Sequence, residues 1–356
     1  MMRILVASDA WHPQVNGVVR TYERLSVELA ALGVEMTVLA PHEFRTLPCP
    51  TYPEIRLALP GLSRIARCFE TVKPDAVHIA TEGPIGWMAR RYCLKHGIRF
   101  TTSFHTRFPE YLSQRFAIPT AWTTAVLRHF HNAGAGLMVA TPSLGRELES
   151  QGFERVLPWT RGIDTTLFHP RPVRLFGDGP VFLYVGRIAS EKNIEAFLDL
   201  ELPGRKVVVG SGPMLEELRA RYPDVVFTGK RTGEALAECY ASADVFVFPS
   251  RTDTFGMVLL EAMASGVPVA ALPVCGPQDI VTNGVTGFLS TDLRQAALRA
   301  LTLDRSVISA KAAEYSWEHA ARLFLANITG ACLTGPQRML ARYKLPLAKA
   351  ARPPLR

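Results

Sequence analysis

The chain lacks the features of several large protein classes. Its six cysteines include no Cys-x-x-Cys pair, so their spacing supports neither a zinc site nor a disulfide framework and fits a reducing compartment. No apolar run is long enough to span a bilayer, and the first one, residues 4–7, ends at Asp9, so no signal peptide is expected. Low-complexity tracts are also missing. These absences predict a cytoplasmic protein.

The composition is that of a globular protein, because 48% apolar and 20% charged residues argue against disorder. At 356 residues the chain exceeds the usual size of a single core, so we expect two domains.

The formal charge of +8 is unevenly placed, because no acid follows Gly335. Apolar side chains interleave with the bases of this tail, residues 335–356, which suits an anionic membrane surface, although Pro346 prevents one continuous amphipathic helix. A solvated terminus explains the tail equally well. Neither interpretation involves nucleic acid. The basic residues of the tail are Arg338, Arg342, Lys344, Lys349, Arg352 and Arg356.

Short apolar runs alternate with helical patterns along the chain, as in parallel βαβ units. Residues 169–180 are rich in proline and glycine, break both patterns and are expected to form a hinge. The sequence therefore predicts an α/β fold with two Rossmann-like, doubly wound domains, residues 1–168 and 181–318, facing each other across a cleft. The expected strands are residues 4–7, 36–39, 76–79, 100–104, 137–140, 181–185, 206–209, 225–228, 245–248 and 268–272.

The most informative segment is residues 249–266, in which an apolar strand is followed by a helix with small residues at its start. A helix that begins at the carboxyl end of a parallel strand presents unpaired N–H groups and suits a phosphate. Asp253 and Glu261 flank this helix start and are placed to bind hydroxyl groups on either side of that phosphate. A sugar nucleotide has this layout of sugar hydroxyls, diphosphate and ribose hydroxyls.

A simpler interpretation is that Asp253 only caps a helix beginning near Phe255. Glu261 favours the functional interpretation, because it lies on a largely apolar helix and burying it without a hydrogen-bonded partner would be costly. A pair of ligand hydroxyls would satisfy it.

Other chemical groups follow predicted strands. Asn16 and Gly17 precede the first helix, where glycine lets the backbone approach a ligand, although an ordinary loop explains them as well. His105 ends the strand 100–104, where a side chain faces a cleft more often than a core. Arg187 and Lys192 follow the strand 181–185, where two cations suit a leaving diphosphate and a solvated pair is the alternative.

Gly210-Ser211-Gly212 matches only the start of a dinucleotide fingerprint, because Leu215 occupies the third glycine position. A nicotinamide cofactor is therefore poorly supported, and a tight turn between strand and helix explains these glycines.

Together these residues resemble the retaining glycosyltransferases of family 4, which have two Rossmann-like domains in the architecture called GT-B. The resemblance extends to about Ile328, and its most specific part is the pair of acids separated by seven residues, Asp253 and Glu261. The first acid is usually glutamate, so the aspartate here is one methylene shorter. The resemblance implies a hexosyltransferase that uses a UDP- or GDP-linked sugar and needs no metal or other cofactor.

The resemblance also implies roles for the residues that match the family's motifs. Glu261 would hold the ribose, Arg187 and Lys192 would clamp the diphosphate, and the base would lie near Gly229 and Lys230. The sugar and diphosphate would meet Asp253 and the amides of Thr254, Phe255, Gly256 and Met257.

In the first domain, the resemblance places His105 near the transferred sugar, and Gly17 near the donor phosphate and the acceptor. Gly17 and Asn16 are therefore expected among the donor-binding residues. Asn16 stands where the family usually has the first of two glycines. The catalytic set is therefore His105, Arg187, Lys192 and Asp253. Residues 315–318 resemble the start of the family's terminal helix, so residues 319–334 are expected to cross back to the first domain.

The acceptor is less specified than the donor. The segment 104–111 is similar both to enzymes that glycosylate diacylglycerol and to mannosyltransferases. Arg64 and Arg67 interleave with apolar residues, which favours a lipid acceptor and peripheral attachment to the inner face of the cell membrane, whereas core burial of those apolar residues is the alternative. Transfer to a polysaccharide or soluble acceptor is a second expectation. An inactive nucleotide-sugar-binding protein is a third, because Asn16 and Asp253 depart from the family pattern.

Overall fold

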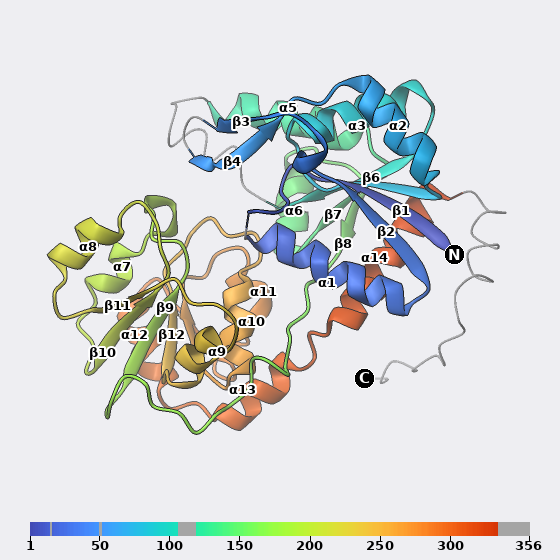
Figure 1. The fold of residues 1–356 in the computed structure, drawn as a ribbon. Coiled ribbons are helices and arrows are strands. Elements are labelled where there is room, and N and C mark those ends of the chain that lie inside the picture. The colour runs from blue at the N-terminus through green and yellow to red at the C-terminus, as the bar shows by residue number, and fades with distance from the viewer. Residues whose placement is uncertain (15, 50–51, 106–118, 334–356) are drawn as a thin grey trace.

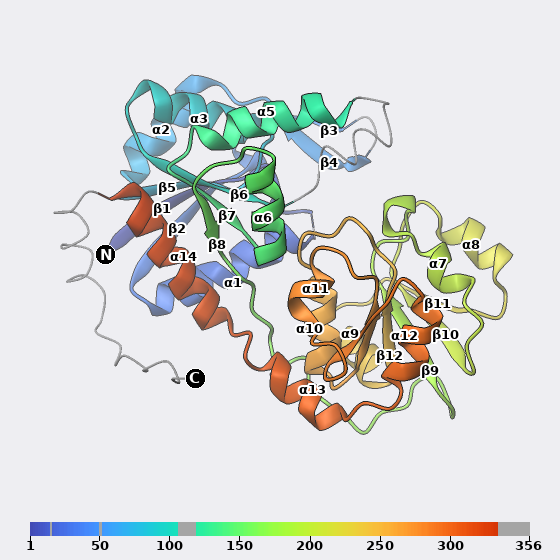
Figure 2. The same ribbon diagram turned by 180° about the vertical axis from the view of Figure 1, so that it is seen from behind.

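The computed structural model describes residues 1–14, 16–49, 52–105 and 119–333. These residues form two six-stranded sheets, in each of which the paired strands run parallel, and one two-stranded antiparallel hairpin. Figures 1 and 2 show the two sheets in separate halves of the molecule, each covered by helices. The tail, residues 335–356, and most of the segment 104–111 lie outside the described residues.

The N-terminal domain is built on a sheet of strand order β2-β1-β5-β6-β7-β8. Its core strands are almost fully buried because helices cover both faces, as is usual in parallel sheets. The sheet comprises β1 Met2–Ala7, β2 Val34–Leu39, β5 Ala76–Ile79, β6 Phe100–Phe104, β7 Gly136–Val139 and β8 Val156–Pro158. The other elements are α1 Gly17–Ala31, η1 Pro41–Glu43, the hairpin β3 Thr46–Cys49 and β4 Tyr52–Ala58, α2 Leu62–Val72, α3 Pro84–Lys95, α5 Thr120–Asn132 and α6 Pro142–Ser150.

The C-terminal domain repeats this plan with the strand order β11-β10-β9-β12-β13-β14. Its strands are β9 Val181–Val185, β10 Arg205–Val209, β11 Val226–Gly229, β12 Val245–Phe248, β13 Val269–Ala271 and β14 Gly287–Leu289. Its helices are η2 Ser190–Lys192, α7 Glu195–Leu198, α8 Leu215–Arg221, α9 Gly233–Ala241, α10 Met257–Ala264, α11 Pro277–Ile280, α12 Leu293–Ala300 and α13 Arg305–Ala312.

The last helix, α14 (Trp317–Cys332), returns to the N-terminal domain (Figures 1 and 2). Its buried face, including Phe324 and Ile328, joins the core beneath β1 and α1, and the indole of Trp159 donates to the carbonyl of Ala320. The helix begins at Trp317 rather than 319, because the Ser316 hydroxyl caps it. None of the helices within the described ranges is long and apolar enough to span a bilayer.

The ten strands expected from apolar runs are confirmed, with ends shifted by two residues at most. The sequence missed β3, β4, β8 and β14. Each of β8 and β14 has only three residues and lies at the edge of its sheet, so its apolar pattern is too short to stand out.

The helix α2 and the segment 169–180 make contacts that the sequence did not specify. On α2, Ile65 and Phe69 are buried in the core and Arg64 pairs with Glu43 at 2.6 Å, so core burial explains the apolar residues of this helix. In the segment 169–180, Phe176 packs in the core of the C-terminal domain and Arg174 bonds to Asp244.

Candidate active site

The carboxyl ends of the two sheets meet between the domains, where direct contacts cross from one domain to the other. The Thr254 hydroxyl donates to the main-chain oxygen of His105 at 2.8 Å. Arg20 on α1 lies 3.7 Å from the buried carboxylate of Glu261 on α10. These contacts join the end of β6 and the helix α1 to the segment 254–261, and Figure 1 shows α1 and α10 facing each other from the two domains. We call this region the interdomain site.

The helix α10 begins at the interdomain site without a side-chain cap from any described residue. Its N-cap is Gly256, whose φ of +90° is accessible to glycine, and a Cβ there would lie 3.0 Å from Leu259. Phe255 is buried beneath the turn. The helix therefore starts at Met257, not near Phe255, and presents free N–H groups at its first turn. The alternative that Asp253 caps it is wrong.

Asp253 instead forms an ion pair with Lys192. The ammonium lies 2.6 Å from Oδ1, and both side chains are 21% exposed. The other carboxylate oxygen, Oδ2, is buried and has no hydrogen-bond partner within the described part of the chain. A buried oxygen of this kind requires a donor, and a ligand hydroxyl would provide one. Arg187 enters the same region directly after β9, where the Tyr184 hydroxyl donates to its carbonyl.

Glu261 is 5% exposed, and its carboxylate is held by two residues that sequence reasoning missed. The Tyr240 hydroxyl donates to Oε2 at 2.8 Å, and Arg20 approaches Oε1. Burial raises the pKa of Glu261, and the Tyr240 hydrogen bond and the Arg20 charge oppose that rise. Tyr240 therefore supplies Glu261 with a protein donor, a partner that the sequence did not reveal.

The helix α1 also begins at the interdomain site, but its N-terminus is capped by a side chain. The Asn16 side chain accepts hydrogen bonds from the amides of Val18 and Val19, both at 3.0 Å. These are the first-turn amides that a phosphate would use. Gly17, the first residue of the helix, has open space where a Cβ would stand.

His105 directs its ring into the N-terminal domain. Nε2 lies 3.0 Å from the Tyr22 hydroxyl and Nδ1 lies 3.2 Å from a guanidinium nitrogen of Arg161. Burial, followed by the charge of Arg161, lowers the pKa of His105 well below its ordinary value. Only the main-chain carbonyl makes the contact with Thr254 described above. The sequence placed this histidine at the domain edge but could not show that its ring turns inward.

The remaining sequence candidates lie at other strand ends of the C-terminal domain. Gly229 ends the edge strand β11 with a φ of +73°, and Lys230 follows it on the surface. Cβ atoms at Gly210 and Gly212 would lie within about 2 Å of carbonyl oxygens, 1.9 Å for the first and 2.1 Å for the second. Tight packing of adjoining loops therefore explains these two glycines.

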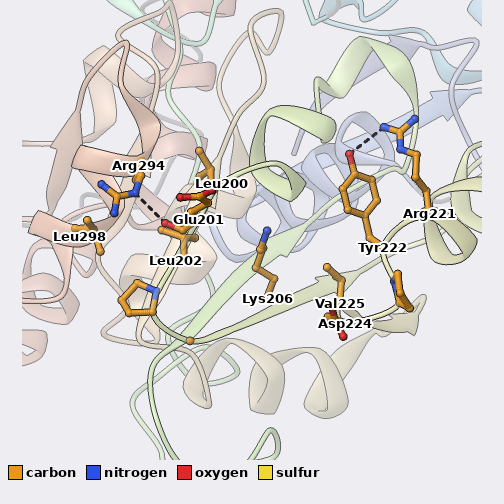
Figure 3. Close-up of a pocket in the computed structure, with 13 residues that line it drawn as sticks. Leu200, Glu201, Leu202, Lys206, Arg221, Tyr222, Asp224, Val225, Arg294 and Leu298 are labelled. Carbon is orange, nitrogen blue, oxygen red and sulfur yellow. Dashed lines mark hydrogen bonds between the residues drawn. The ribbon is translucent and has the colours of Figure 1, made fainter.

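A cavity of about 760 Å³ lies in the C-terminal domain, between the segments that precede β10 and β11 and the helix α12. Figure 3 shows its lining around Lys206, with Arg294 bonded to the carbonyl of Glu201. It adjoins the amino end of β10, whereas ligands of open α/β sheets bind beyond the carboxyl ends. We therefore do not assign the ligand to this cavity. Across the described ranges, no three His, Cys, Asp or Glu side chains gather as metal ligands would.

The sequence matches two family models. "Glycosyltransferase Family 4" matches residues 15–167 and "Glycosyl transferases group 1" matches residues 179–303. A GDP-mannose-dependent alpha-mannosyltransferase of Mycobacterium tuberculosis is 32% identical over 81% of this chain and 83% of its own length. The sulfoquinovosyl transferase SQD2 of Arabidopsis thaliana is 30% identical over 86% and 69%, respectively. The alpha-monoglucosyldiacylglycerol synthase of Streptococcus pneumoniae is 26% identical over 89% and 83%.

Solved structures share the fold at lower sequence identity. Sucrose-phosphate synthase from Thermosynechococcus elongatus superposes with a TM-score of 0.74 at 22% identity, covering 91% of this chain and 97% of that protein. HepE of Anabaena in complex with UDP-glucose gives a TM-score of 0.70 at 15% identity, covering 93% and 100%. The chain therefore belongs to the family 4 glycosyltransferases and has their two-domain GT-B fold.

Proposed function

We propose that this enzyme transfers a hexose of the glucose, glucuronic acid or mannose type from a UDP- or GDP-linked sugar to a hydroxyl of a membrane lipid such as diacylglycerol. The relatives support this donor class, because one uses GDP-mannose and another makes a glucosyl diacylglycerol. The observation that carries the proposal is the uncapped start of α10, flanked by two carboxylates.

In this proposal the diphosphate of the donor lies at the start of α10, where free N–H groups and the helix dipole favour negative charge. Lys192, whose ammonium donates to Asp253, supplies one cation for the phosphate oxygens. Arg187 adds a second cation beside the leaving group. The charge of the leaving diphosphate is thus met by protein groups, and the proposal includes no metal or other cofactor.

The two carboxylates hold the rings on either side of the diphosphate. A sugar hydroxyl donates to the unpartnered Oδ2 of Asp253, and the ribose hydroxyls reach Oε1 of Glu261 on the side where Arg20 now lies. The base lies beyond the ribose, towards Gly229 and Lys230. In this arrangement the donor extends from the end of β9 across β10 to the end of the edge strand β11, in the order of the strands in the sheet.

The reaction proceeds with retention of anomeric configuration. The acceptor oxygen attacks the anomeric carbon from the face that the phosphate leaves, so the new glycosidic bond forms as the bond to the phosphate oxygen breaks. The acceptor proton moves to the departing phosphate oxygen. The protein holds the two substrates together and stabilises the leaving charge.

Exposed apolar side chains on the N-terminal domain support a lipid acceptor. Trp122 is 75% exposed, Leu59 57%, Leu47 55% and Val126 53%. Figures 1 and 2 both show the hairpin β3–β4 and the start of α5 at the same end of this domain. Exposed apolar side chains on elements at one end of a domain suit the surface of a bilayer. The enzyme would then attach peripherally to the inner face of the cell membrane.

Transfer to a polysaccharide or soluble acceptor is the second candidate. It is favoured by the mannosyltransferase relative, whose identity to this chain, 32%, exceeds that of the diacylglycerol enzyme, 26%.

The test is to incubate the full chain with UDP- and GDP-hexoses, adding either vesicles that contain diacylglycerol or soluble sugars, and to identify products by mass spectrometry. We expect a hexosyl lipid from the vesicles. Product from soluble sugars alone would favour the second candidate. Tight donor binding without any product or donor hydrolysis would indicate an inactive binding protein.

A further inference from the structure

A directed chain of hydrogen bonds runs through the N-terminal domain beside the interdomain site. It starts at Arg161, whose guanidinium can donate hydrogen bonds but cannot accept them. Nδ1 of His105, 3.2 Å away, must therefore accept. The ring hydrogen is then on Nε2 and is donated to the Tyr22 hydroxyl at 3.0 Å. The Arg161 contact thus selects one neutral tautomer of His105.

The chain of hydrogen bonds continues from Tyr22 away from the interdomain site, with each group donating to the next. Because the Tyr22 hydroxyl accepts from His105, its own hydrogen is free for Nε2 of His78 at 2.8 Å. The other ring nitrogen of His78 then donates to the Thr101 hydroxyl, also at 2.8 Å. Both histidines are neutral in this arrangement, and each ring nitrogen has a partner.

Arg161 is itself held rigidly. One guanidinium nitrogen donates to the carbonyls of Trp159, at 2.7 Å, and Thr160, at 3.2 Å. The guanidinium lies 4.1 Å from the centre of the Trp159 ring, and the residue is 4% exposed. Its donor geometry is therefore set by packing and does not depend on a ligand.

We propose that Arg161 is a positioning residue for the transfer reaction, holding His105 as a neutral imidazole so that its main-chain carbonyl stays directed at Thr254. This inference rests on the proposed function of the interdomain site. Positive charge develops on the sugar ring during glycosyl transfer, and an imidazolium at this position would oppose it. Arg161 prevents that by occupying the only nitrogen that could take up a second proton.

The surroundings of His105 agree with this assignment. Among the described residues, the titratable or charged groups that face it are Tyr22 from α1, His78 from β5, His131 from α5 and Arg161. The acid behind them, Glu82, contacts Nε2 of His131 at 3.1 Å, so its carboxylate is directed at that ring and not at His105. Burial is the largest cause that lowers the pKa of His105, and the charge of Arg161 is the next.

The test compares R161M with R90M and Y22F in the full chain. Arg90 is a matched control, because it too lies against a tryptophan, Trp87, and bonds to carbonyls and to His129, away from the interdomain site. Two readouts are taken between pH 5.5 and 8.5. These are the rate of hexose transfer and the tautomer of His105, followed by ¹⁵N NMR of histidine-labelled protein without substrate.

We expect wild type to show a hydrogen on Nε2 and none on Nδ1 at every pH, and kcat to change less than about twofold over this range. In R161M, Nδ1 of His105 loses its donor and becomes able to take up a proton, and loss of the Arg161 charge raises the pKa of the ring although burial still lowers it. The signal of a hydrogen on Nε2 alone should therefore be lost towards pH 5.5, and kcat there should fall severalfold below its value at pH 8. R90M and Y22F should keep the wild-type pH profile, because Arg161 still contacts His105.

A doubly protonated or Nδ1-protonated His105 in wild type would overturn the inference, even if R161M failed to fold. An R161M profile without the acid limb would also overturn it. The NMR readout needs no substrate, so a correct tautomer in a wild-type protein without transferase activity would separate this inference from the proposed function.

Discussion

In the N-terminal domain the first helix begins beneath the Asn16 side chain, whereas the helix α10 that faces it from the C-terminal domain begins at Gly256 with no side-chain cap from the described residues. The Asn16 side chain therefore binds the first-turn amides of α1, whereas the first-turn amides of α10 are left for a ligand. The same difference extends to the charged groups. His105 and Tyr22 form a neutral, internally satisfied network, whereas the Lys192–Asp253 pair retains an unpartnered oxygen.

This contrast teaches how one fold, used twice, divides a reaction between two substrates. In the proposed function, the satisfied edge would position a neutral acceptor without attracting anions, and the incompletely satisfied edge would bind the charged donor. Groups that lack partners in the free protein lower stability and are retained where a ligand supplies the partner. The predictions below test this division, starting with the largest expected effect.

Replacing Lys192 with alanine should lower kcat by about 10²–10³-fold, on the scale of losing one key electrostatic donor. The ammonium meets the leaving diphosphate and orients Asp253, so both functions are lost together. Steady-state transfer assays measure the effect. K311A is the control, because Lys311 forms an exposed pair with Glu314 far from the interdomain site. Turnover of K192A within threefold of wild type would contradict the role.

E261Q should weaken the binding of UDP or GDP about tenfold, because a neutral amide replaces a charged acceptor of the ribose hydroxyls. Titration calorimetry measures the Kd. Tyr240 can still donate to the amide oxygen, so the packing is retained. A variant with wild-type affinity would remove Glu261 from the donor site.

The same variant should be more stable than wild type at pH 7. Burial raises the pKa of Glu261 above its ordinary value of 4.5, so the folded protein holds that proton more tightly than the unfolded chain does. The stability contributed by this group is present below pH 4.5 and is lost as the pH rises through the raised pKa. Glutamine does not titrate, so its contribution to stability does not fall as the pH rises. Thermal unfolding should show a higher Tm for E261Q at pH 7 and no gain at pH 4, and a lower Tm at pH 7 would contradict the sign.

G256A and G17A compare the two helix starts directly. At Gly256 an alanine must adopt a positive φ and contact Leu259, which costs about 1–3 kcal/mol. At Gly17 the added methyl meets open space. We expect thermal unfolding to show a Tm lowered by several degrees for G256A and by less than one degree for G17A. Equal losses would mean that the two helix starts are built alike.

N16A should have the smallest effect, a loss of about 1 kcal/mol of stability from the missing cap of α1. Donor affinity should stay within about twofold, because these amides are not assigned to the diphosphate. Denaturant unfolding and calorimetry check the two parts. A tenfold loss of UDP or GDP affinity in N16A would show that the N-terminal helix shares in donor binding.

Much of this organisation could be predicted from the sequence, because βα loops at the carboxyl ends of parallel strands gather at one edge. From the sequence alone, that rule predicts that Lys192, Asp253 and Glu261 lie at one edge of the C-terminal sheet. Tyr240, Arg161 and Arg20 could not be found in this way. Their partners lie 21 to 241 positions away in sequence, and the contacts depend on how the helices and the two domains pack.

The orientation of His105 illustrates the same limit. Its position after β6 follows from the apolar run before it, but the direction of its ring depends on hydrogen bonds with Tyr22, 83 residues away, and Arg161, 56 residues away. The cap on α1 is a partial exception, since asparagine before a helix is a recognised N-cap signal. Sequence reasoning placed Asn16 among the donor-binding residues and did not identify it as this cap.

Hydrogen exchange measured by mass spectrometry, with and without UDP or GDP, tests the central claim most directly. The account predicts that the nucleotide slows exchange of the amides in residues 252–261 and leaves residues 16–20 and the cavity segment 200–206 unchanged. Protection of residues 16–20 or 200–206 without protection of 252–261 would contradict it.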